Sequence, residues 1–285
     1  MAEQNDDLRQ WIGRSETQND ILHGSHLAGL SALLDGDEQT PDDGTPLIPT
    51  AHWLFFQPRA PQSEIGSDGH PNRGGFMPAI ELPRRMWAGS RLEYIKPLLV
   101  GQAITRKSTI TDIVQKQSSA GALIFVTVKR AYEGPNGLAL LEDQDIVYRD
   151  DPTPNSAAPK PKPAPENSDW QASVQPDEVM LFRYSAVTFN SHRIHYDLPY
   201  ATTVEGYPGL IIHGPLSATL LIENFRKNTP GTILTSYHYR SVSPLICGKP
   251  ITFAGAQSSD AMSADVWAKN ASGHLAMQGK VTWRS

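Results

Sequence analysis

Residues 93–105 read EYIKPLLVGQAIT, and residues 240–252 read RSVSPLICGKPIT. Both stretches contain the pattern Pro-Leu-x-x-Gly-x-x-Ile-Thr, and a constant offset of 147 residues separates them. Proline and glycine are typical of turns, so each copy predicts a strand, a turn and a second strand. We interpret the two copies as the mark of an internal duplication, in which one fold occurs twice in the chain.

The sequence that follows each copy continues this parallel. Alternating runs rich in β-branched residues predict strands at 109–114, 122–130 and 143–148 after the first copy, and at 264–268 and 275–283 after the second. Several strands in succession, without long helices between them, are typical of an antiparallel sheet.

Helical signals are few. Residues 17–20 (TQND) are predicted to cap a helix over residues 21–34, which carries several leucines. In the second half, Gly214 and Pro215 are predicted to open a helix that ends at Pro230. One helix and several strands per half predict an α+β fold, in which a curved antiparallel sheet wraps round a central helix in each half.

Residues 151–166 differ sharply in composition from the rest of the chain, because they contain six prolines. Proline has no backbone donor, and the segment has little apolar surface to bury. It is therefore predicted to be an extended, semi-rigid linker. This linker separates a first domain, residues 1–150, from a second domain, residues 167–285.

The composition excludes several classes of protein. The 285 residues include 25 Lys+Arg and 30 Asp+Glu, a formal charge of −5, which argues against nucleic acid as a partner. Cys247 is the only cysteine, so neither an intrachain disulfide nor a cysteine-rich zinc site can form. The sequence has neither an apolar run long enough to span a membrane nor a secretory signal pattern at its start. We therefore expect a soluble, cytoplasmic protein with no membrane partner.

The densest group of reactive side chains lies within residues 182–216. Composition alone would allow a zinc site built from His192, His195, His213 and Asp197. The spacing of these residues is not specific to zinc, and buried structural histidines are a further alternative. We favour a site without a metal.

Residues 190–195 (NSHRIH) and 212–216 (IHGPL) resemble the motif of MaoC-type, R-specific enoyl-thioester hydratases. The sequence of these motifs is most similar to the branch of itaconyl-CoA hydratases, mesaconyl-C4-CoA (3-methylfumaryl-CoA) hydratases and mitochondrial 3-hydroxyacyl-thioester dehydratases. Residues 11–14 and 73–89 also resemble this branch, so the resemblance covers most of the chain outside the linker. It implies a double hot-dog fold with a catalytic second half and a first half that forms the acyl or CoA tunnel.

Hydration of an unsaturated thioester explains these residue types. The reaction needs a base for water, a proton for Cα, and donors for the charge that develops on the thioester oxygen. His195 is the expected acid/base, because imidazole titrates near neutral pH. Gly214 is expected to offer its N–H at a helix N-terminus, where unpaired amides favour negative charge.

One position departs from the broad family, which has an aspartate where this chain has Asn190. An amide can orient a water molecule, but it cannot take its proton. Either His195 relays both protons, or a carboxylate such as Asp197 or Glu205 supplies a second acid/base group. We favour the version centred on His195, and Asp197 has the alternative role of pairing with Arg193.

Three arginines are candidates for substrate recognition. Arg73, Arg84 and Arg85 adjoin glycines or a proline, and they are therefore expected on loops. Guanidinium groups bind carboxylates and phosphates in bidentate fashion, so one could recognise a distal carboxylate and another a CoA phosphate. The alternative is that they are solvated surface residues. Arg193 and His213, inside the motif, are further candidates for substrate contacts.

The resemblance predicts a hydro-lyase that reversibly hydrates itaconyl-CoA or mesaconyl-C4-CoA to citramalyl-CoA. CoA belongs to the substrate, and no separate cofactor is expected. The alternatives are a 3-hydroxyacyl-thioester dehydratase of fatty-acid synthesis, a hot-dog thioesterase, and a non-catalytic acyl-CoA-binding protein. The sequence leaves open whether two chains associate as a homodimer.

Overall fold

The computed structural model describes residues 8–36, 39–118, 121–151, 160–259 and 262–284. The strands and helices follow one another along the chain as β1 (Ser15–Ile21), α2 (Gly24–Leu33), the 3-10 turns η1 (Ala51–Leu54) and η2 (Gln62–Glu64), β2 (Arg84–Tyr94), β3 (Ala103–Ser118), β4 (Gly121–Gly134), β5 (Gly137–Arg149), β6 (Trp170–Val174), α3 (Glu178–Thr188), the 3-10 turn η3 (Arg193–His195), the π-helical turn η4 (Tyr200–Val204), α4 (Gly214–Asn228), β7 (Ile233–Ser241), β8 (Ile251–Gln257), β9 (Ser263–Lys269) and β10 (Leu275–Arg284). Within this part of the chain, no helix has the length and apolar character needed to cross a membrane.

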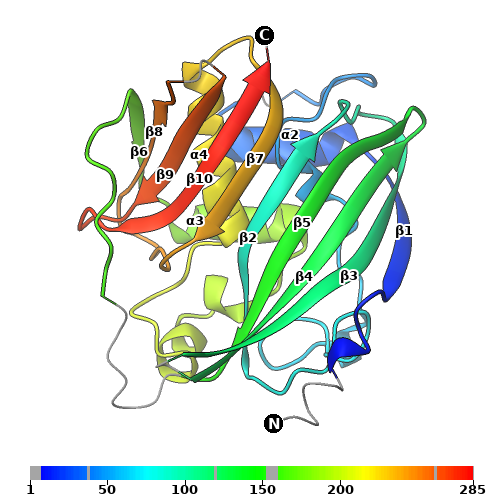
Figure 1. Cartoon of the computed structure of the whole chain (residues 1–285), viewed down its shortest axis with the longest axis vertical. Helices are drawn as coiled ribbons and strands as arrows, with labels where there is room; N and C mark the ends of the chain where they lie inside the picture. Colours follow the sequence, from blue (N-terminus) through cyan, green and yellow to red (C-terminus); the bar gives the residue numbers. More distant parts are fainter. Residues whose placement is uncertain (1–7, 37–38, 119–120, 152–159, 260–261, 285) are drawn as a thin grey trace.

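The strands form one curved antiparallel sheet in the order β1-β3-β4-β5-β2-β7-β10-β9-β8-β6 (Figure 1). The second five strands repeat the order of the first five in reverse, so each half contributes an equivalent set. The predicted α+β class is confirmed, and the sheets of the two halves join edge to edge through β2 and β7.

The register between β2 and β7 reflects the duplication. Arg91 pairs directly with His238 in the antiparallel ladder, and these two positions are separated by the same 147 residues as the repeated motif. Equivalent positions of the two copies therefore meet at this pair, which marks a pseudo-twofold relation between the halves.

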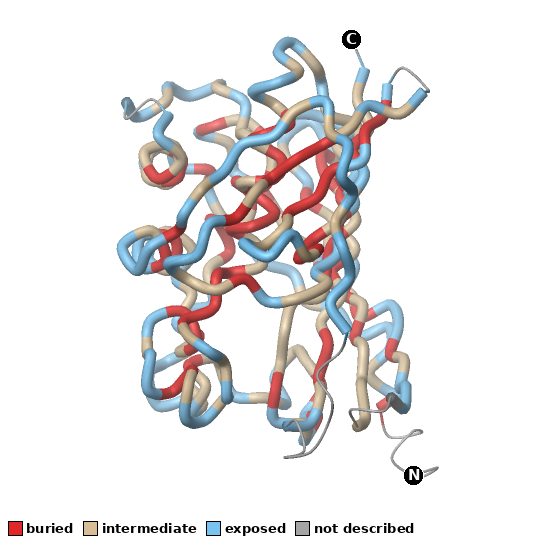
Figure 2. Tube along the Cα trace, turned by 90° about the vertical axis from the view of Figure 1, so that its left-hand side faces the viewer, coloured by how far each residue is buried: buried red, intermediate tan, exposed pale blue. Residues whose placement is uncertain are grey.

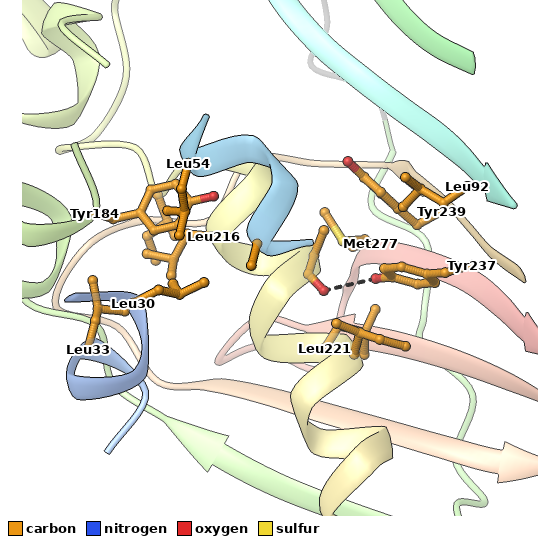
Figure 3. Close-up of a cluster of buried hydrophobic side chains, with 14 of the residues drawn as sticks. Leu30, Leu33, Leu54, Leu92, Tyr184, Leu216, Leu221, Tyr237, Tyr239 and Met277 are labelled. Carbon is orange, nitrogen blue, oxygen red and sulfur yellow. Dashed lines mark hydrogen bonds between the residues drawn. The ribbon is translucent and has the colours of Figure 1, made fainter. Parts of the chain in front are cut away.

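A single hydrophobic core extends across both halves. Figure 3 shows α4 between the sheet on one side and α2, η1 and α3 on the other. In β7, Tyr237 and Tyr239 are buried and His238 between them is exposed, as the two-residue period of a strand requires. The Tyr237 hydroxyl donates to the Ala218 carbonyl of α4 at 3.0 Å. In Figure 2 the buried segments gather in the interior and the exposed segments lie on the outside.

Among the described residues of the first half there is no counterpart of α4. The equivalent positions fall in the 55–83 loop, which connects η1 to β2 and contains only the short turn η2. Figure 1 shows this loop at the same end of the molecule as the segment that follows α3. The halves therefore share a sheet topology but differ in what covers it.

Two local predictions are wrong. Residues 17–20 do not cap a helix, because they lie in β1 and pair with β3, and the helix begins only at Gly24. Arg84 and Arg85 do not lie on a loop, because they begin β2 and pair with the end of β5. In both places the edge of a neighbouring strand offers backbone hydrogen bonds that override the local turn-forming residues.

The predicted linker is partly described, since residues 152–159 lie outside the described residues. Beyond them the backbone of Lys162 accepts a hydrogen bond from Leu275 N, and Ala164 N donates to Gly273 O. This end of the linker therefore runs beside the start of β10. The domain boundaries stay a prediction.

Candidate active site

The segment after α3 is shaped by the way that helix ends. Phe189 takes a left-handed conformation, φ 51° and ψ 39°, and Asn190 N donates to Ser185 O at 2.9 Å. The Asn190 side-chain oxygen then accepts the backbone N–H of His192 at 2.9 Å. Asn190 also lines the pocket, where its NH₂ group can act as a donor.

His195 lies in η3 and is buried. Its Nδ1 lies 2.7 Å from the Ile211 carbonyl, which can only accept, so Nδ1 carries the proton and Nε2 is a bare acceptor. Burial lowers the pKa of His195 to about 4, although the Ile211 carbonyl opposes the shift. The imidazole is therefore neutral at physiological pH, and its Nε2 lone pair is available to accept a proton.

His213 packs against the ring of His195. Their rings stack with centroids 3.6 Å apart, and His213 Nε2 lies 2.8 Å from the Ser185 hydroxyl. Complete burial, together with the nearby His195 and His192, holds the pKa of His213 well below its usual value. His213 is not among the pocket-lining residues, so the structure places it as a packing partner of His195.

Gly214 begins α4 directly after His213, and Pro215 follows it, as predicted. The first amides of a helix have no partner within the helix, and the helix dipole adds positive potential there. Gly214 lines the pocket beside His195. This terminus is therefore placed to receive an oxygen that gains negative charge.

The pocket is a cavity of about 1700 Å³ between the two halves. The second half contributes Asn190, His192, His195 and Gly214 to its wall. The first half contributes polar and apolar side chains, among them His70, Arg73, Arg85, Leu123, Phe125 and Ile146.

The three candidate arginines have different roles in the structure. Arg85 lines the pocket, and its buried Nε has no hydrogen-bond partner among the described residues. Arg73 also lines the pocket, but its guanidinium donates to the carbonyls of Ile80, Leu82 and Pro83 and so holds the 55–83 loop together.

Arg84 is buried away from the pocket. It forms ion pairs with Asp151 at 2.7 Å and with Glu205 at 3.4 Å, so both Arg84 and Glu205 are already paired. Burial raises the pKa of Glu205, and the charge of Arg84 counteracts this.

Arg193 and Asp197 pair with each other, at 2.6 Å between Nη2 and Oδ2. Asp197 also accepts the backbone N–H of Tyr200 at 3.0 Å. These two contacts lower the pKa of Asp197. None of Arg84, Glu205, Arg193 and Asp197 is among the residues that line the pocket, so neither suggested second carboxylate faces His195.

The sequence reasoning missed a group that the first half supplies. His70, from the 55–83 loop, lines the pocket, and its ring lies 4.2 Å from the ring of His192. Asp68 Oδ2 lies 3.2 Å from His70 Nδ1. The available signal was a histidine among the turn-forming residues 66–72 (GSDGHPN), which composition alone could not connect to the motif 120 residues away.

One group of side chains that could hold a metal ion is found among the described residues. It consists of Asp68, His70 and His192, whose ligand atoms all lie within 4.8 Å of one another. The set weighed from the sequence, with His195, His213 and Asp197, is not assembled in this way. The charges of Arg85 and Arg73 both act on His70, and two positive charges oppose the binding of a divalent cation.

Comparison with known proteins gives consistent results. The family model for hydroxyacyl-thioester dehydratase type 2 matches residues 50–247. A Chloroflexus aurantiacus protein named mesaconyl-C(4)-CoA hydratase is 42% identical over 278 residues, which cover 96% of this chain and 97% of that protein. The mitochondrial hydroxyacyl-thioester dehydratase type 2 of Schizosaccharomyces pombe is 30% identical and covers 73% of this chain and 77% of its own.

Solved structures agree on the fold. A MaoC-like dehydratase superposes with a TM-score of 0.72 at 15% identity, over 97% of this chain and 99% of that one. A Mycobacterium tuberculosis protein described as having a double hotdog fold gives a TM-score of 0.60 at 11% identity, over 98% of each chain. The predicted double hot-dog fold is confirmed.

Proposed function

The chain belongs to the hydroxyacyl-thioester dehydratase type 2 family and is a hydro-lyase, and from this we propose that it reversibly hydrates mesaconyl-C4-CoA to citramalyl-CoA. The proposal takes its substrate from the name of the relative that is 42% identical over nearly the whole chain. CoA enters as part of the substrate, and the proposal needs no separate cofactor. Itaconyl-CoA, an isomeric C5 dicarboxylyl thioester, is the first comparison substrate.

In the proposed reaction His195 Nε2 takes a proton from water as the water oxygen bonds to Cβ. The π electrons move toward the thioester oxygen, which accepts a hydrogen bond from Gly214 N–H at the start of α4. The imidazolium of His195 then returns the proton to Cα. An imidazolium with a pKa of about 4 is a strong enough acid for this step, and an oriented oxyanion donor typically lowers the barrier by about 3–4 kcal/mol.

The position of the free carboxylate supports Arg85 as the residue that recognises it. In mesaconyl-C4-CoA this carboxylate is bonded to Cβ, the carbon that water attacks, so its cationic partner must lie beside the catalytic histidines. Burial is the largest cause of the lowered pKa of His192, and the charge of Arg85 adds to it, as it does at His70. The observation that carries the proposal is that Arg85 lines this pocket with a buried Nε that has no partner among the described residues, and that its charge acts on both His70 and His192.

The test is a substrate panel with a matched pair of variants. We expect the wild type to remove the conjugated absorbance of mesaconyl-C4-CoA and the Arg85→Gln variant to lose about 100-fold in kcat/KM, because a charge-assisted contact is lost. Crotonyl-CoA has no carboxylate, so its kcat/KM should change little. Arg91→Gln is the control, since Arg91 lies on the same strand but pairs with Asp145. Equal losses on both substrates would contradict the role of Arg85.

A second candidate is the dehydration of straight-chain 3-hydroxyacyl thioesters. It is supported by the apolar side chains of Leu123, Phe125 and Ile146, which extend the pocket wall along β4 and β5. This surface suits an alkyl chain better than a carboxylate. Straight-chain 3-hydroxyacyl substrates in the same panel distinguish the two candidates, and release of free thiol would reveal thioesterase activity instead.

A further inference from the structure

The 55–83 loop of the first half is fastened to the catalytic segment of the second half. Arg193 N donates to Asp68 O at 2.9 Å, and the Arg193 guanidinium donates to Ser67 O at 3.0 Å. The Ser191 hydroxyl donates to Gly69 O. These contacts fix the loop at the backbone level, next to the turn that carries His195.

Within the loop, Asp68 orients His70 by two hydrogen bonds. Its Oδ1 accepts the His70 backbone N–H at 2.9 Å, and its Oδ2 lies 3.2 Å from His70 Nδ1. Burial disfavours the charge of Asp68, but the hydrogen bond and charge of His70 outweigh this and hold the pKa of Asp68 well below its usual range. The carboxylate is therefore ionised and can only accept, so His70 carries its proton on Nδ1 and leaves Nε2 as a bare acceptor.

The water molecule that attacks Cβ must be held by hydrogen bonds, so that one of its lone pairs points at the carbon. Of its two protons, one is taken by His195 Nε2, and the second needs an acceptor. Its remaining lone pair needs a donor, and the NH₂ group of Asn190 is placed to supply one. In the broad family an aspartate carboxylate stands at this position, whereas Asn190 is a neutral amide that cannot take a proton and whose oxygen already accepts the His192 N–H.

We propose that the Asp68–His70 pair, supplied by the first half, replaces the missing carboxylate: His70 Nε2 accepts a hydrogen bond from the attacking water while His195 removes the other proton. The proposal rests on the hydration chemistry of the proposed function. His70 and His195 line one pocket, and the ring centroid of His192 lies 4.2 Å from that of His70 and 5.3 Å from that of His195. The water's O–H bond to His195 breaks, its C–O bond forms, and His70 keeps its own proton throughout.

The Asp68→Asn variant isolates this role with almost no change in shape. The His70 backbone N–H keeps the amide oxygen on its own side, so the amide nitrogen faces Nδ1 and donates to it. His70 must then carry its proton on Nε2 and can no longer accept from water. We expect kcat to fall by about 10²- to 10⁴-fold, with KM within threefold of the wild type and the melting temperature little changed.

His70 itself is tested with a pair of replacements. His70→Gln retains an oxygen that can accept a hydrogen bond and should keep more activity than His70→Leu, which retains no acceptor. Ser67→Ala is the control in the same loop, because within the described part of the chain the hydrogen bond of Ser67 to Arg193 uses its backbone carbonyl and not its side chain. It should leave kcat unchanged. Imidazole ¹⁵N chemical shifts of His70, which report its tautomer directly, should show Nδ1–H in the wild type and Nε2–H in Asp68→Asn.

The outcomes separate this inference from the proposed function. A wild type that hydrates no thioester would overturn both. An active wild type with an equally active Asp68→Asn variant would overturn only the role of His70 and would favour His195 acting alone. Activity that is lost with a chelator and restored by Zn²⁺ would also overturn it, because Asp68, His70 and His192 would then bind metal.

Discussion

Gly69 is the residue that allows the 55–83 loop to approach the catalytic segment closely. It has a φ of +89°, and a Cβ at this position would lie 1.9 Å from the Ser191 carbonyl oxygen. That distance leaves no room for a side chain without moving the loop away from the catalytic segment. A glycine is therefore required both by conformation and by close approach.

We predict that Gly69→Ala lowers kcat at least tenfold, roughly the lower limit for losing one catalytic contact, and destabilises the fold by more than the ~1 kcal/mol that a positive φ alone costs. Gly74→Ala is the matched control in the same loop. Gly74 has a φ of +92°, but its Cβ would meet only Ala79 at 3.7 Å. Urea denaturation and steady-state kinetics measure the two effects. Equal behaviour of the two variants would show that the contact with Ser191 is unimportant.

The sequence predicts some site residues better than others. His195 and Gly214 could be located because they belong to two short motifs, residues 190–195 and 212–216, whose residue types match the chemistry. The structure places both on the pocket wall. Arg84 and Arg85 are neighbours in the sequence, but successive residues of a strand point to opposite faces. Nothing in a single sequence decides which of the two faces the pocket. Asp68 and His70 depend on a contact between distant segments, and local patterns carry no such information.

At the scale of elements, the N-terminus of α4 joins folding to chemistry. A Cβ on Gly214 would lie 3.8 Å from the Trp87 carbonyl and 3.9 Å from the Ser241 hydroxyl, both ordinary contacts. The fold thus tolerates a methyl group there. The same methyl group would stand at the amide that faces the pocket.

We therefore predict that Gly214→Ala leaves the free energy of unfolding unchanged or raises it by up to ~1 kcal/mol, because alanine favours a helix. Thioester hydration should slow by about tenfold or more as the donor becomes hindered. Thermal or chemical denaturation and kcat measure the two properties. A large loss of stability would mean that the glycine serves the helix rather than the pocket.

The elements themselves were predictable where a pattern repeats. The strands around the duplicated motif and the helix that opens at Gly214 follow from periodicity and turn residues, and the structure contains them. β1 was not predictable, because its seven residues are mostly polar and it is a strand only through its pairing with β3 at the sheet edge. The missing helix of the first half was equally hidden, since the 55–83 loop takes its form from contacts with the other half.

At the scale of the whole molecule, buried neutral histidines tie stability to pH. Burial holds the pKa of His195 at about 4 and that of His192 at about 2, and it depresses the pKa of His213 as well. In the unfolded chain these groups titrate near 6.5. Below that pH the unfolded state binds more protons than the folded state, so stability is lost as the pH falls.

We predict a loss of about 2 kcal/mol for each of His192 and His195 between pH 7 and pH 5, with a further loss from His213 in the same direction. Urea denaturation at several pH values measures how steeply the free energy of unfolding falls as the pH is lowered. The His213→Gln variant lacks one of the three histidines and should show a smaller fall. A stability that is constant from pH 7 to pH 5 would contradict the buried, neutral state of the cluster. Glu142, buried near the ring of His52, adds a further loss only at lower pH, because its pKa is about 2.

The pairing of Arg91 with His238 has an evolutionary consequence. In a symmetric dimer of identical chains, every substitution appears at both copies of a position, so a change that helps one site must be tolerated at the other. Fusion of the two copies through β2 and β7 removes that constraint. One copy could then keep the helix terminus and the histidine motif. The other could exchange its helix for a loop that reaches across the junction between β2 and β7. The single chain can be regarded as a dimer whose subunits are inherited together yet mutate independently.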